Sequence, residues 1–110
     1  MIHVLASIIV KPGKRDILIE HIKSNIPHVI KENGCIEYNP TIDVDYPINN
    51  QQCDESIVTI IEKWENFDTL KKHMHAPHML SYREKVKDLV ENTSLKILTN
   101  TLSLKFPMVC

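Results

Sequence analysis

The segment SIVTIIEKW, residues 56–64, predicts a β-strand that is apolar on both sides. At a period of two, one face carries Val58, Ile60, Glu62 and Trp64, and the other carries Ile57, Thr59 and Ile61. Such a strand must be covered on both faces. Glu62 is a carboxylate on an otherwise apolar face, where it needs a partner. We expect a salt bridge, with Arg83 as one candidate, and keep an acid–base role as the alternative.

The segments around this strand predict the order strand, helix, strand, strand, helix, strand. Strands are expected at residues 2–10, 35–44, 56–64 and 94–106, and helices at residues 15–34 and 67–89, the second divided near Pro77. Pro27 should kink the first helix or divide it in two, because proline removes a backbone donor. Pro40 favours an edge position or a bulge for its strand. The order predicts an α+β fold, a ferredoxin-like split βαβ with an antiparallel sheet, and residues 1–110 as a single domain.

Three further expectations concern the second half of the chain. Asn66 should cap the helix that follows residue 64, and its buried stripe should consist of Phe67, Leu70 and Met74. The polar residues 45–55 predict a long loop. The last strand should alternate Leu98, Leu102, Leu104 and Phe106 on one face.

The two-sided strands raise a burial problem. Helices cover only one face of a sheet of this kind, yet the strands over residues 2–10 and 56–64 are apolar on both faces. A second copy of the sheet is the simplest cover for the open face. We therefore expect a homodimer with a closed, barrel-like interior.

Composition excludes several classes of partner. The 110 residues carry a formal net charge of −1 and 43% hydrophobic residues, without the basic excess that nucleic-acid or acidic-membrane binding requires. No stretch approaches the length of a membrane span, and the N-terminal apolar run lacks the charge order of a signal peptide. Cys35, Cys53 and Cys110 are widely spaced, which favours a reducing cytoplasm over a disulfide framework. We expect no nucleic-acid and no membrane partner.

The segment HMHAPH, residues 73–78, contains three histidines. A metal site would need them to converge, but on a helix with about 100° per residue His73 and His75 point in opposite directions. We expect no metal here. We expect His75 to face solvent. His73 is either a pocket residue or a half-buried histidine bonded to backbone, and His78 is either a weaker companion of His73 in the pocket or an exposed polar residue.

Four short motifs resemble those of a known family. KPGK follows the first strand, GCIEY stands at the helix-to-strand junction, IEKWENFDTL runs from the third strand into the second helix, and His73 is followed by Pro77-His78. In this order the motifs resemble the antibiotic biosynthesis monooxygenase (ABM) domain family over nearly the whole chain. The resemblance implies a dimeric α/β barrel. It also implies one of several activities: cofactor-free oxygenation of quinols or anthrones, haem degradation, or processing of a phosphorylated signalling sugar.

The resemblance carries over residue by residue. Trp64 and Arg83 match a Trp and an Arg that line the pocket of anthrone-oxidising members, while Ile60 stands where those members have an Asn. Haem degradation is disfavoured, because His73 replaces a Trp and Ala6 an Asn of the haem-degrading members. Members acting on quinols or on the sugar phosphate share the histidine pattern.

The candidate site therefore has two catalytic residues, His73 and His78, and four substrate-binding residues, Trp64, Arg83, Glu62 and Tyr82. In the first functional hypothesis His73 takes a hydroxyl proton from a quinol or similar aromatic, and the anion reacts with dioxygen without a cofactor. Trp64 would be a flat wall for the ring or only a core residue. Arg83 would bind a phenolate or phosphate, or only cover the helix with its stem.

Two other functions remain open on sequence grounds. One is an isomerase-like enzyme on a small phosphorylated hydroxyketone, with His73 and His78 moving protons and Arg83 or a lysine holding the phosphate. The other is a dimeric small-molecule-binding or stress-related protein whose pocket carries no chemistry.

Overall fold

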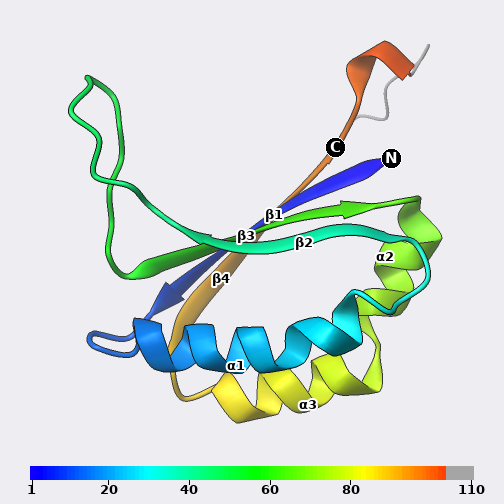
Figure 1. Cartoon of the computed structure of the whole chain (residues 1–110), viewed down its shortest axis with the longest axis horizontal. Helices are drawn as coiled ribbons and strands as arrows, with labels where there is room; N and C mark the ends of the chain where they lie inside the picture. The colour runs from blue at the N-terminus through cyan, green and yellow to red at the C-terminus, as the bar shows by residue number, and fades with distance from the viewer. Residues whose placement is uncertain (104–110) are drawn as a thin grey trace.

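A computed structural model describes residues 1–103 of the chain (Figure 1). Its elements are β1 (Ile2–Val10), α1 (Arg15–Val29), β2 (Cys35–Ile42), β3 (Ile57–Trp64), α2 (Phe67–Met74), α3 (Pro77–Val86), β4 (Val90–Thr99) and a short 3₁₀ helix (Thr101–Ser103). The predicted order of strands and helices and the α+β class are confirmed. None of the helices described is long and apolar enough to cross a membrane.

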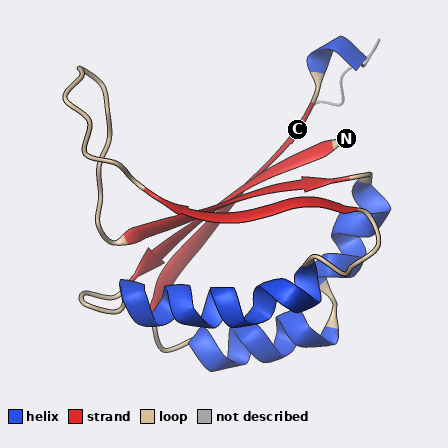
Figure 2. Cartoon of the chain, viewed as in Figure 1, coloured by secondary structure: helices blue, strands red, loops and turns tan. Residues whose placement is uncertain are grey.

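The four strands form one antiparallel sheet in the order β2-β3-β1-β4, and the helices gather on one side of it (Figure 2). Alternate residues of β1 and β3 are buried beneath the helices, which confirms the predicted period of two: Ile2, Val4, Ala6, Ile8, Val10, Val58, Ile60, Glu62 and Trp64. From α1 the residues Leu18, Ile22 and Val29 complete this core. α1 packs along α3 as well as against β2 and β3.

The other face of the sheet is not covered by a helix in the part of the chain that is described (Figure 2). Leu5 pairs there with Ile61, and Ile9 with Ile57. These four side chains are half-buried. The apolar second face expected from the sequence is therefore present.

Of the two effects predicted for Pro27, a kink or a division of the first helix, the division is wrong. α1 runs through Pro27 as one helix and ends two residues later, at Val29. The proline is exposed in the last turn, and so is Lys23 one turn earlier, whose carbonyl group loses its helical partner. Water can bond to that carbonyl group, so the missing hydrogen bond is tolerated.

β2 is an edge strand, as Pro40 indicated, and it begins with a bulge. Cys35 pairs with Trp64 and Glu37 with Lys63, so Ile36 is the extra residue of the bulge. Ile36 is consequently exposed, while Tyr38 is buried.

The start of α2 is defined by Asn66 and Thr69. The Asn66 side chain accepts a hydrogen bond from the Thr69 N–H at 2.9 Å, and the Thr69 hydroxyl bonds back to Asn66, which completes a capping box. The cap is confirmed, but the predicted buried stripe is partly wrong. Thr69, Leu70 and His73 are buried, whereas Phe67 is 47% exposed.

A close contact explains why Thr69 and His73 of α2 face the core and Phe67 does not. Gly34 has φ +83°, and a Cβ atom there would lie 2.6 Å from the Cβ of Thr69. The backbone of the α1–β2 turn therefore rests directly on Thr69, which turns the Thr69 and His73 side of the helix inward. The Glu65 N–H donates to the Gly34 carbonyl oxygen at 2.9 Å and ties the same turn to the end of β3.

The last strand begins earlier than predicted and ends earlier. β4 covers Val90–Thr99, and Leu102 lies in the 3₁₀ helix, fully exposed, instead of in the strand. Leu104 and Phe106 lie outside the described residues. On the side of β4 that faces the helices, Leu95 and Ile97 remain 51% and 45% exposed. The loop between β2 and β3 extends beyond the end of the sheet, as Figure 1 shows, and contains the residues predicted to form it.

Candidate functional site

A cavity of about 370 Å³ lies between the sheet and the helices α2 and α3. Its lining is mostly apolar and includes Val4, Ala6, Ile8, Ile60, Leu70 and Met79. The volume falls within the roughly 300–1,000 Å³ of small-molecule pockets. Polar groups line the same space, supplied by Tyr38, Glu62, His73, Tyr82, Arg83, Lys87 and Thr93.

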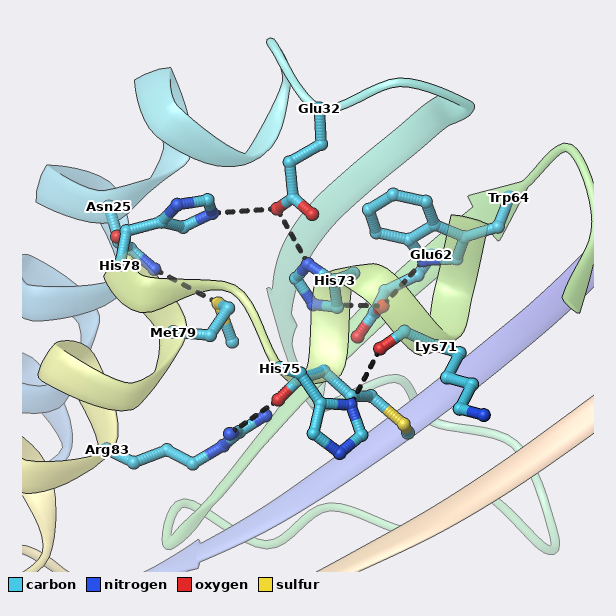
Figure 3. A network of polar contacts seen from close by, with 11 residues as sticks. Asn25, Glu32, Glu62, Trp64, Lys71, His73, His75, His78, Met79 and Arg83 are labelled. Carbon is cyan, nitrogen blue, oxygen red and sulfur yellow. Dashed lines mark hydrogen bonds and ion pairs between the residues drawn. The ribbon is translucent and has the colours of Figure 1, made fainter. Parts of the chain in front are cut away.

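Glu62 projects from β3 into this cavity and is 5% exposed. Its Oε1 accepts a hydrogen bond from the indole N–H of Trp64 at 2.9 Å and lies 3.9 Å from Nε2 of His73 (Figure 3). Burial raises the pKa of Glu62 to about 7, and the charge of Glu32 adds to the rise, whereas the bond from Trp64 opposes it. The expected salt bridge between Glu62 and Arg83 is absent among the described residues, because Arg83 donates instead to the Met74 carbonyl oxygen at 2.8 Å.

His73 stands beside Glu62 and is 4% exposed. Its Nδ1 lies 2.8 Å from Oε2 of Glu32, and its ring packs against Trp64 and Tyr38 with centroid distances of 4.5 and 5.5 Å. Burial lowers the pKa of His73, although the hydrogen bond to Glu32 works in the opposite direction. A neutral ring whose Nδ1–H donates to a carboxylate has its lone pair on Nε2. That nitrogen faces Glu62.

Glu32 connects the two histidines that the sequence singled out. Its Oε2 lies 2.8 Å from Nδ1 of His73 and 2.8 Å from Nε2 of His78 (Figure 3). Glu32 follows the end of α1 and precedes Gly34, in the turn that rests on Thr69. Sequence reasoning missed this residue, because a lone acidic side chain in a turn carries no periodic signal.

His78 and His75 occupy different places. His78 does not line the cavity, but borders an outer hollow of about 140 Å³ between α1 and α3. The centroid of its ring lies 5.8 Å from the ring centroid of His28. His75 is exposed, and its Nδ1 donates to the Lys71 carbonyl oxygen at 2.9 Å. Within residues 1–103, no three His, Cys, Asp or Glu side chains are placed to hold a metal ion.

The other predicted site residues divide into two groups. Tyr82 and Arg83 line the cavity, and burial raises the pKa of Tyr82 to about 12, so its hydroxyl group remains a donor at neutral pH. Trp64 does not line the cavity. It is fully buried behind Glu62 and His73, where it supports both side chains and offers no flat wall to a ligand.

Comparison with known proteins places this arrangement in a family. Residues 1–85 match the family model described as antibiotic biosynthesis monooxygenase. The chain belongs to the antibiotic biosynthesis monooxygenase family. Over 100 residues it is 33% identical to the Escherichia coli K12 protein named "Probable quinol monooxygenase YgiN", an alignment that covers 89% of this chain and 96% of YgiN.

Solved structures of other proteins have a similar fold. A conserved protein from Methanosarcina mazei is 26% identical with a TM-score of 0.76, over 88% of this chain and 89% of its own. Rv0793 from Mycobacterium tuberculosis has a TM-score of 0.74 over 90% of this chain and 93% of its own; at 22% identity it supports the fold alone. The family match ends at residue 85, whereas the cavity wall continues through Val86, Val90 and Leu95.

Proposed function

We propose that this member of the antibiotic biosynthesis monooxygenase family is a cofactor-independent monooxygenase of a quinol or a similar electron-rich aromatic. The observation that carries the proposal is the apolar cavity with a buried carboxylate and a neutral histidine on one wall. An apolar space of this size suits an uncharged aromatic ring. The family and the relative YgiN support the same reaction class.

His73 is the proposed base. Its Nε2 accepts a hydroxyl proton of the quinol, and the carboxylate of Glu32, 2.8 Å from Nδ1, stabilises the imidazolium that forms. The quinol anion is electron-rich enough to reduce dioxygen. One oxygen atom adds to the ring as a hydroxyl group, the other leaves as water with two hydrogens of the quinol, and the product is a hydroxyquinone.

Glu62 and two residues of α3 are proposed to bind the anion. In its neutral form Glu62 donates a hydrogen bond to the substrate oxygen, as a buried carboxylic acid can when its pKa is raised. Arg83 and the hydroxyl group of Tyr82 line the opposite side and offer further donors.

Oxygen uptake tests the proposal. The protein is purified, treated with a chelator and checked by absorbance to contain no flavin. It is then expected to consume oxygen when a quinol is added and to form one hydroxyquinone per dioxygen. His73→Ala should lower the rate by about a hundredfold or more, as loss of a general base does. The control is His75→Ala, which changes an exposed histidine next to the same helix. Undiminished uptake by His73→Ala would remove the proposed base.

A second candidate is favoured by the cations of the cavity. Arg83 and Lys87 both line it, and two cations suit a phosphate group. The alternative is an isomerase-like reaction of a small phosphorylated hydroxyketone, with His73 as the base. Inorganic phosphate at millimolar concentration should inhibit this reaction by competing with the phosphorylated substrate for Arg83 and Lys87.

We also propose that two copies associate through the open face of the sheet. The half-buried residues Leu5, Ile9, Ile57 and Ile61 give this face an apolar centre that a second sheet would cover. Sedimentation at micromolar concentration should show a dimer. A monomer under these conditions would contradict the proposed assembly.

A further inference from the structure

Four titratable side chains form a continuous row from the cavity to the protein surface. Glu62 lies 3.9 Å from His73, His73 lies 2.8 Å from Glu32, and Glu32 lies 2.8 Å from His78. Their side chains are 6%, 5%, 13% and 24% exposed in this order. Figure 3 shows the row as a line of dashed contacts.

The row links two separate spaces. Glu62 and His73 line the inner cavity, whereas His78 lines the outer hollow between α1 and α3. Glu32 is not among the residues that line either space, and its Oε2 lies 2.8 Å from a ring nitrogen of each histidine. Solvent reaches the side chain of His78 more readily than that of His73, so a group between them can link the base inside the cavity to solvent.

We infer that Glu32 carries protons between His73 in the cavity and His78 at the surface, as the middle of a path that connects the site to solvent. The use of this path during catalysis rests on the proposed function. The existence of the path does not. A proton accepted at Nε2 of His73 allows the proton on Nδ1 to move to Glu32. Glu32 then protonates Nε2 of His78 when that nitrogen carries no hydrogen, and Nδ1 of the same ring releases a proton to water.

The path must run in both directions. Oxygenation first removes a hydroxyl proton from the quinol and later needs a proton when one oxygen atom leaves as water. The four side chains therefore return to their starting protonation states after each cycle, and no further oxidant or reductant takes part.

Other titratable groups near His73 do not replace Glu32. Burial raises the pKa of Tyr38 and of Cys35 from β2, and it raises the pKa of Tyr82 from α3 to about 12. These groups therefore keep their protons at neutral pH. Arg83 stays charged and only disfavours a positive charge on His73.

Exchange of a ring proton tests the path without any substrate. In ¹⁵N-histidine-labelled protein near pH 7, His73 is expected to carry its hydrogen on Nδ1, and NMR reports how fast this hydrogen exchanges with water. Glu32→Gln keeps an oxygen that accepts from Nδ1–H but cannot take up a proton, so exchange should slow by about tenfold or more. His78→Gln, a milder change at the exposed end, should slow it as well. His28→Gln alters the ring beside His78 without touching Glu32, and should leave it unchanged.

Quinol-dependent oxygen uptake is the second readout. Glu32→Gln should lower the rate about tenfold, and added imidazole should restore it in proportion to its concentration, because a small buffer can carry the proton instead. A Glu32→Gln protein with unchanged exchange, or one whose lost activity imidazole does not restore, would overturn the inference and leave Glu32 a positioning residue. Failure of the wild-type protein to oxidise any quinol would instead contradict the proposed function, since the exchange measurement does not depend on it.

Discussion

Replacing Glu62 with glutamine should make the stability of the protein less dependent on pH. Burial raises the pKa of Glu62 from 4.5 to about 7, so the folded state disfavours the ionised carboxylate. The contribution of protonated Glu62 to the free energy of unfolding is therefore complete below pH 4.5. This contribution is lost as the pH rises through about 7. A tenfold change in acid dissociation corresponds to about 1.4 kcal/mol, so the wild-type protein should lose about 3 kcal/mol across this interval.

Glutamine cannot ionise and avoids this loss. Its side-chain oxygen can still accept the hydrogen bond that Trp64 donates to Glu62 at 2.9 Å. Relative to wild type, Glu62→Gln should therefore gain about 3 kcal/mol in free energy of unfolding between pH 4 and pH 8.5.

Urea unfolding at a series of pH values measures this difference. Trp64 is the single tryptophan and is fully buried, so its fluorescence reports unfolding, with circular dichroism as a second probe. Protein concentration must be held constant in case association contributes. Glu91→Gln, on an exposed position of β4, is the control and should follow the wild-type curve. Parallel curves for wild type and Glu62→Gln would refute the assignment of a buried, readily protonated carboxyl group.

The same structure makes three further predictions. The rate of quinol oxygenation should rise with pH below pH 6.5 as His73 loses its proton, and should fall above about pH 7 as Glu62 ionises. Glu62→Gln keeps a hydrogen-bond donor and should remove the fall. A fall that persists in this variant would exclude Glu62 as the donor to the substrate. Gly34→Ala should lower the free energy of unfolding by about 2 kcal/mol or more, because the methyl group of the alanine would collide with Thr69 and the positive φ would be strained. Thermal unfolding measures the loss. An unchanged melting temperature would disprove the contact. Asn66→Ala removes the cap of α2 and should cost about 1 kcal/mol by urea unfolding, whereas Asn66→Ser should retain most of it.

The strand pattern made much of the sheet predictable. The period of two in residues 56–64 placed Glu62 and Trp64 on one buried face, and the structure confirms it. The last strand was harder, since residues 90–106 contain apolar side chains in both phases and neither glycine nor proline marks the start at Val90. Its register comes from pairing with β1, which a single sequence does not reveal.

The candidate site was predictable only where its residues lie on regular elements. His73 and Arg83 border predicted helix faces, and both line the cavity. Glu32 depends on the approach of the α1–β2 turn to α2, which Gly34 and Thr69 make possible. Such a tertiary contact has no local pattern, so the partner of both histidines could not be foreseen.

The shared oxygen of Glu32 has a consequence for how the two histidines hold charge. A single carboxylate oxygen lies 2.8 Å from a nitrogen of each ring, so one negative charge serves two groups that can each become cations. A positive charge on His78 lowers the pKa of His73. A proton on His78 therefore makes a second positive charge on His73 less favourable, so the charge at the outer hollow influences the base inside the cavity.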